Sequence, residues 1–128
     1  MSLSWRPSRD LSMAFGYDTS SALSPSFRSG LTLMTPTAYD NLYVEADWSI
    51  SDDGRLTVDL QNNRNRGAID DSDRLVASLS YSHRINDDVS LAIGGRYVDF
   101  DDRLTPVGET SNRTYSALTY WAELRLGF

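Results

Sequence analysis

Strict alternation of apolar and polar residues over the last fourteen positions, 115–128, constrains the fold more than any other stretch of the chain. Counting back in twos from the last residue gives a set that is entirely apolar or aromatic: Phe128, Leu126, Leu124, Ala122, Tyr120 and Leu118. The intervening residues are polar, charged or small, apart from Trp121. Because successive side chains of a β-strand point to opposite faces, this stretch predicts a strand with one apolar and one mainly polar face.

The same two-residue period recurs in segments along the whole chain. No segment shows the 3.6-residue apolar period of an amphipathic helix. The segments predicted as strands are 2–6, 10–18, 41–50, 55–65, 73–84, 88–99 and 114–128. Nothing marks a domain boundary, so residues 1–128 are expected to form one all-β domain, an antiparallel up-and-down meander of the kind that closes into a barrel.

The connections between these segments alternate in length. The short ones are turns rich in Asp, Asn, Ser, Pro and Gly, at 6–10, 51–54 and 86–88. The long ones are predicted as polar loops, at 19–41, 62–73 and 99–113. Transmembrane β-barrels of bacteria have this asymmetry, with short turns on the periplasmic side and longer loops outside.

The number of strands has two interpretations. Seven strands, an odd number, would make the chain the C-terminal part of a larger barrel or one protomer of a shared barrel, since bacterial single-chain barrels have even strand numbers. In the alternative interpretation, the segment Phe27–Met34 inside the first long loop is an additional strand. The chain would then form a complete eight-stranded barrel, a common small size.

Composition excludes several classes of protein. The formal net charge of −6 argues against a general nucleic-acid binder, which would normally show a basic face. The chain has no cysteine for disulfides or thiolate metal sites, and no run approaches the roughly 18 apolar residues of a membrane helix. The first ten residues lack the apolar stretch of a signal peptide, so an exported protein is expected here in mature or fragmentary form.

The polar phase of the predicted strands carries many Ser, Thr and Gly residues together with a set of charges. We expect these charges to face a watery lumen: Glu45, Asp47, Asp59, Arg96, Glu123 and Arg125. On the last two strands, Arg96, Glu123 and Arg125 are expected to form a ladder of alternating charge. A soluble lipocalin-like or sandwich fold would produce the same alternation with its apolar face turned inward, and it remains the competing interpretation.

Aromatic residues gather near the ends of the predicted strands. Beside the short turns lie Trp5, Trp48, Tyr81 and Phe128, and towards the long loops lie Tyr17 and Tyr97. Amphipathic aromatic rings prefer the two interfaces of a bilayer. The distribution therefore favours a membrane-spanning barrel over the soluble alternative and predicts these residues as interfacial aromatics.

The last strand resembles the C-terminal assembly signal of Gram-negative outer-membrane β-barrels. The residues that carry this resemblance are Tyr120, Ala122, Leu124, Leu126 and Phe128. The hairpins around the three short turns are also similar to the periplasmic hairpins of that family. The resemblance implies an outer-membrane location, contact with the lipid bilayer, and recognition of the last strand by the barrel-assembly machinery.

Catalytic and metal-binding chemistry is not expected. The single histidine, His83, falls in the apolar phase near a short turn, where an interfacial residue is expected rather than a catalytic one. Acidic residues cluster in the predicted loops, at Asp70, Asp71, Asp73, Asp99, Asp101 and Asp102, and are expected to be solvated rather than to hold a cation. The predicted function is a passive outer-membrane pore without a cofactor. The alternative is a structural or surface-interaction barrel with a packed lumen.

Overall fold

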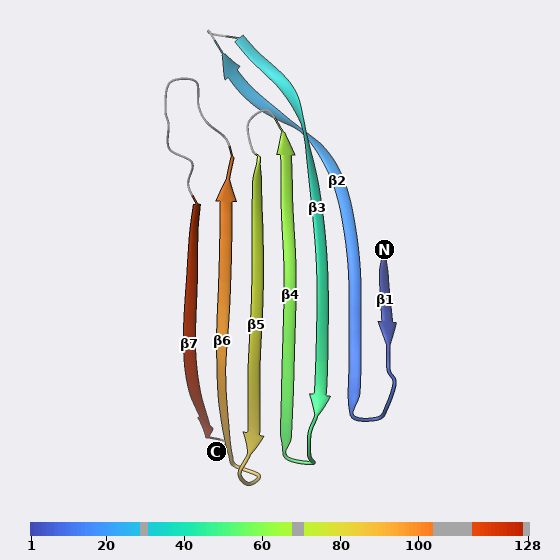
Figure 1. Ribbon diagram of the computed structural model, residues 1–128, viewed down its shortest axis with the longest axis vertical. Coiled ribbons are helices and arrows are strands. Elements are labelled where there is room, and N and C mark those ends of the chain that lie inside the picture. The colour runs from blue at the N-terminus through green and yellow to red at the C-terminus, as the bar shows by residue number, and fades with distance from the viewer. Residues whose placement is uncertain (29–30, 68–70, 104–113, 127–128) are drawn as a thin grey trace.

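The structure is a computed structural model that describes residues 1–28, 31–67, 71–103 and 114–126, with the backbone alone at 24–28, 31–33 and 35. Its regular elements are seven β-strands: β1 (Ser2–Trp5), β2 (Leu11–Arg28), β3 (Leu31–Ser49), β4 (Gly54–Gly67), β5 (Ser72–Arg84), β6 (Val89–Asp102) and β7 (Thr114–Leu126). Each strand pairs antiparallel with the next in one sheet of order β1 to β7 (Figure 1). The predicted all-β antiparallel meander is thus confirmed.

The sheet is a single open layer over the residues described. β1 pairs with β2 alone and β7 with β6 alone, so these two strands form the edges of the sheet. The arrangement is consistent with an up-and-down barrel, although the sheet is not closed. Within the described ranges there is no helix long and apolar enough to cross a membrane.

The register aligns the apolar phases of all seven strands on one side of the sheet. Directly paired residues share a face, and one continuous row of pairs runs Trp5, Met13, Ala46, Val58, Leu79, Gly95 and Tyr120. The next row runs Leu3, Phe15, Val44, Leu60, Ala77, Tyr97 and Leu118. We call the side that carries these rows the apolar face, and the opposite side the polar face.

The lower end of the hydrogen-bonded ladder steps down steadily across the sheet. On β1 the ladder ends at Trp5, whose row includes Tyr120, whereas on β7 it ends at Leu126, six residues after Tyr120. Six residues span about 20 Å along a strand, and the six strand spacings from β1 to β7 span about 29 Å. The resulting tilt, about 35°, lies at the lower end of the range typical of closed barrels, about 35–45°.

The first long loop was predicted wrongly, because residues 19–28 and 31–41 continue β2 and β3 as one long hairpin. Phe27–Met34 is accordingly no separate strand: its described residues belong to the far ends of β2 and β3. The described chain therefore has seven strands, and the eight-stranded alternative is wrong.

The prolines of this hairpin explain how a loop-like composition forms strands. Pro25 lies above the region of β2 that pairs with β1, and Pro36 lies just beyond Thr37, the last residue of β3 that pairs with β4. Each proline therefore sits where one edge of its strand has no ladder partner among the described residues. Proline is tolerated at such edges because it has no N–H to donate.

The other two long connections are shorter than predicted. β4 continues to Gly67 and β5 begins at Ser72, while β6 continues to Asp102. Both phases are polar at the facing ends of β4 and β5, so the alternation that marks a strand disappears from the sequence there. Pairing continues nevertheless, because polar residues face each other across the strands, as in the pair Arg64 and Asp73.

Candidate functional site: the two faces of the sheet and a charged collar

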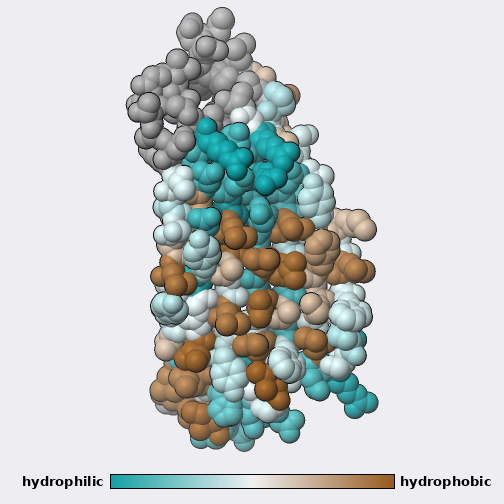
Figure 2. All heavy atoms as spheres, viewed as in Figure 1, coloured by the Kyte–Doolittle hydropathy of each residue, from teal (hydrophilic) through white to brown (hydrophobic). Residues whose placement is uncertain are grey.

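The apolar face is exposed, and nothing in the described part of the chain packs over it. Leu79, in the central strand β5, is 52% exposed, and Tyr120 in β7 is 75% exposed. Among the described residues, the buried hydrophobic side chains are Val76 and Ala92, and both belong to the polar face. Figure 2 shows hydrophobic residues over the lower part of the molecule and hydrophilic residues above them. The side chains that form a core in a soluble sheet are therefore exposed here.

These exposed side chains form a band of limited height, which we call the apolar band. On β3 it extends from Leu42 to Trp48, seven residues or about 24 Å, and on β7 from Leu118 to Leu126, nine residues or about 31 Å. A tilt of about 35° reduces these lengths to about 20–25 Å measured across the band. The apolar belt of outer-membrane barrels is about 25 Å tall.

The structure places all five described aromatics of the predicted interfacial set on the apolar face. Trp48 and Tyr81 lie in one row near the short turns, with Trp5 at the lower end of β1. Tyr17 and Tyr97 lie at the upper end of the band. Phe128, the remaining member, falls outside the described residues. Their contact with a bilayer interface stays a prediction.

The other members of the predicted assembly signal lie on one side of β7. Tyr120, Ala122, Leu124 and Leu126 pair with apolar-face positions of β6, namely Gly95, Ile93, Leu91 and Val89. All four are exposed. The single histidine also lies on this face: His83 stacks on Tyr81 with ring centroids 6.3 Å apart and an interplanar angle of 12°.

The polar face collects all six charges predicted to line a lumen. Glu45 and Asp59 are direct register partners, and Arg96 lies two strands further along the same row. Asp47 accepts a hydrogen bond from the Thr57 hydroxyl at 2.7 Å. The register thus brings the six together on one face; whether this face lines a lumen stays a prediction.

The expected ladder of charge on β6 and β7 forms only in part. Arg125 donates two hydrogen bonds to the Glu123 carboxylate, at 2.9 and 3.1 Å, within the same strand. For Arg96, the described residues supply no carboxylate within 4.0 Å. Of the three charges expected in the ladder, Glu123 and Arg125 therefore form an ion pair, and Arg96 is an exposed cation.

Two aromatic rings cover glycines on the polar face. Tyr43 lies over its register partner Gly16, and Trp121 over its register partner Gly94, so closely that a Cβ on either glycine would collide with the ring. Sequence reasoning singled out Trp121 and missed Tyr43. The signal is a glycine directly opposite an aromatic residue, and it is visible only when the register is known.

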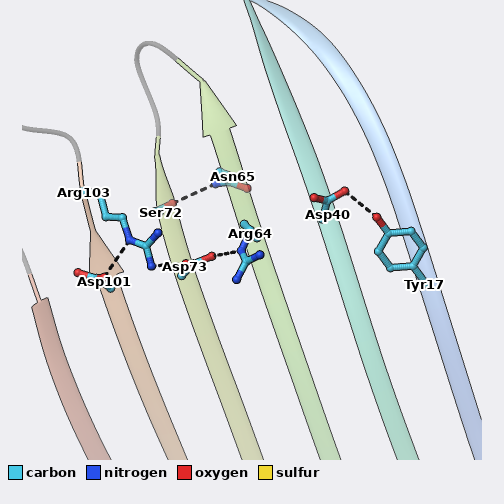
Figure 3. A network of polar contacts seen from close by, with 8 residues as sticks. All are labelled: Tyr17, Asp40, Arg64, Asn65, Ser72, Asp73, Asp101 and Arg103. Carbon is cyan, nitrogen blue, oxygen red and sulfur yellow. Dashed lines mark hydrogen bonds and ion pairs between the residues drawn. The ribbon is translucent and has the colours of Figure 1, made fainter.

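Above the apolar band, the apolar face of the sheet carries charged residues instead. We call them the charged collar: Asp40, Arg64, Asp73, Asp101 and Arg103 (Figure 3). The Asp73 carboxylate joins two arginines, Arg64 Nε at 2.6 Å and an Arg103 terminal nitrogen at 2.8 Å. Arg103 also contacts Asp101 at 3.1 Å. The collar therefore links β4, β5 and the end of β6 by ion pairs.

Hydrogen bonds set the ionisation of two carboxylates in the collar. The Thr114 hydroxyl, 2.9 Å from Asp101, and secondarily the Arg103 guanidinium hold the pKa of Asp101 below its ordinary value. Bonds from the hydroxyls of Thr19 and then Tyr17 lower the pKa of Asp40 in the same way. Both groups are therefore anions at neutral pH.

The acidic clusters noted in the sequence do not come together as a cation site in the residues described. Asp73 and Asp101 are engaged by arginines, and the described ranges hold no group of three His, Cys, Asp or Glu residues placed to bind a metal. Asp70 lies outside the described residues. Asp73 and Asp101 instead take part in contacts between neighbouring strands.

Comparison with known proteins finds no matching family model, no matching curated protein and no matching solved structure. The features that bear on the class of this protein are therefore those of its own sheet: the polar face, the apolar band and the charged collar.

Proposed function

We propose that this chain forms the wall of a β-barrel in the outer membrane of a Gram-negative bacterium and acts as a passive pore whose polar face lines the lumen. The observation that carries the proposal is an exposed apolar band on one face of a single sheet whose opposite face carries the charges. Water penalises such a band, since large apolar patches on soluble proteins normally mark a surface that something else covers. Lipid removes that penalty.

The stagger of the sheet supports a barrel in particular. A bilayer tolerates no open sheet edge, because unpaired backbone groups in hydrocarbon cost several kcal/mol each. Closure requires tilted strands, and the register already gives a tilt of about 35°. The sheet thus has the geometry of a barrel wall before its edges are joined.

Strand direction bears on how the wall closes. Six antiparallel steps separate β1 from β7, so both strands run towards the short-turn end (Figure 1). Edge strands that run the same way cannot pair antiparallel with each other. The proposal therefore includes an odd number of further strands, in a larger barrel or in one shared with another chain.

The polar face suits a lumen by its residue types. One row of the polar face carries the directly paired Glu45 and Asp59, and Ser78 separates Asp59 from Arg96. Exposed charges on a lumen wall tune the selectivity of a pore. We propose no catalytic group, cofactor or metal for this face.

The outer-membrane assignment rests on the last strand. Tyr120, Leu124 and Leu126 alternate along an edge strand whose outer side has no partner among the described residues, and the sequence continues this phase to Phe128. An open strand edge suits recognition by strand addition. The barrel-assembly machinery is therefore the proposed partner during biogenesis.

A second candidate function is favoured by the rings on the polar face. Tyr43 and Trp121 each fill the space above a glycine, and such rings would pack the interior of a narrow barrel. In that case the barrel is a structural or surface-interaction protein whose contacts lie beyond the collar. The two candidates differ in whether ions pass.

One experiment tests both candidates. The complete barrel, which includes the further strands that the proposal requires, is refolded into liposomes, separated by flotation, and then fused with a planar bilayer for conductance recording. Insertion with stable conductance steps supports the pore, whereas insertion without conductance overturns the pore in favour of the structural barrel. Cooperative folding to a monodisperse protein in plain buffer would overturn both.

A further inference from the structure

A hollow of about 430 Å³ lies where the apolar band meets the charged collar. Its lining comes from the apolar face of β2, β3 and β4: Tyr17, Asp40, Leu42, Asn62, Arg64 and Arg66. The lower wall thus includes a leucine of the apolar band, and the upper wall includes two arginines. A ligand that fits it must itself be apolar below and charged above.

The charge of the hollow favours an anion. Arg66 is exposed, and no carboxylate among the described residues lies within 4.0 Å of its guanidinium. Arg64 contacts the Asp73 carboxylate through Nε. The one carboxylate in the lining, Asp40, already accepts a hydrogen bond from the Tyr17 hydroxyl at 3.0 Å. Asp73 is shared with Arg103 and so offsets Arg64 only in part, and Arg66 is the guanidinium of the lining that has no ion pair among the described residues.

We infer that this hollow binds the phosphate of an anionic lipid whose acyl chains lie along the apolar band. Guanidinium groups present a fork of donors that matches phosphate oxygens. Leu42 continues downward into Val44 and Leu60 on the same face, which gives the acyl chains a surface. A free phosphate ion gains nothing from contact with that apolar surface, whereas an acyl chain does, so the occupant is a lipid.

This inference rests on the proposed function, because it needs the apolar band to lie in a bilayer. The border position then places the hollow at the level of the lipid headgroups. Each arginine near a charged membrane surface contributes about 1 kcal/mol of attraction. That energy corresponds to a change of about five-fold in affinity for each arginine removed.

The test compares Arg66→Gln with Arg9→Gln in the full chain. Arg9 lies in the turn at 6–10, at the opposite end of the apolar band, and its replacement removes the same charge. Each protein is inserted into phosphatidylcholine nanodiscs that contain spin-labelled phosphatidic acid or spin-labelled phosphatidylcholine. The electron spin resonance spectrum gives the fraction of each label immobilised by the protein, and hence the preference for the anionic lipid.

We expect the native protein to prefer phosphatidic acid, Arg66→Gln to lose about five-fold of that preference, and Arg9→Gln to retain it. Equal preferences in all three proteins would overturn the site while leaving the barrel intact. Failure of the native protein to insert would instead refute the proposed function. Inorganic phosphate that binds the protein in neutral detergent through Arg66, without any lipid preference, would overturn the lipid as occupant.

Discussion

An arginine at position 79 should separate a lipid-facing band from a water-facing one. Leu79 lies near the middle of the apolar band on β5, between its row partners Val58 and Gly95, and is 52% exposed. On a surface in water, such a substitution changes the free energy of unfolding by no more than about 0.5 kcal/mol. Near the midplane of a bilayer it costs about 2–4 kcal/mol.

The neighbouring residue supplies the matched control. Ser80 lies on the polar face in the row of Thr57 and Asp47, so an arginine there is on the polar side with a carboxylate in its row. We expect Ser80→Arg to cost much less than Leu79→Arg. The variant Leu79→Ala separates the lost leucine contacts from the cost of the charge.

The measurement is denaturant unfolding of protein inserted into phosphatidylcholine vesicles, followed by tryptophan fluorescence and extrapolated linearly to zero denaturant. The difference in unfolding free energy between Leu79→Arg and Leu79→Ala gives the charge cost. Similar costs at positions 79 and 80, or a neutral Leu79→Arg, would refute the assignment of this face to lipid.

Three further outcomes are expected. A Cβ at Gly94 would lie 2.5 Å from the Trp121 ring, whereas one at Gly95 meets only an ordinary contact at 3.4 Å, so Gly94→Ala should cost about 1–3 kcal/mol of unfolding free energy and Gly95→Ala much less. The pKa of Asp101 is lowered from 3.8, so its contribution to stability is complete above that value and is lost as the pH falls through the lower folded pKa. Unfolding titrations below about pH 4 should therefore show a loss of stability that the variant Asp101→Asn lacks. Phe128→Ala should lower the yield of protein in the outer membrane far more than the stability of refolded protein, because full burial of a phenylalanine is worth only about 1.5–3 kcal/mol; equal effects would contradict an assembly signal.

The facing of the strands was predictable from sequence because it depends on a local period. Leu79 and Ser80 go to opposite faces whatever their strand pairs with, so the apolar and polar sets followed directly from alternation. The upper hairpin was not predictable in this way. Its serines, threonines and prolines are typical of loops, and only the open edges beside Pro25 and Pro36 reconcile them with strands.

The features that need register were beyond the sequence. The ring of Tyr43 over Gly16 and the collar ion pair between Arg64 and Asp73 each join residues on different strands. Which residues meet depends on where each turn begins and on how many residues it uses. The sequence placed Asp73 at the border of a solvated loop, whereas pairing of β4 with β5 brings it to an arginine.

Facing and stagger are independent properties of this sheet, and their agreement strengthens the proposal of a barrel. Facing depends on which residue types occupy alternate positions, whereas stagger depends on where the successive turns end the ladder, from Trp5 on β1 to Leu126 on β7. A soluble sheet under a second layer needs the first property but places no comparable demand on the second. A barrel wall needs both, because only a tilted sheet closes and only an apolar outer face remains stable in lipid. The seventh strand, Thr114–Leu126, has an open edge that runs parallel to the first, so antiparallel closure of the proposed barrel requires strands beyond these seven.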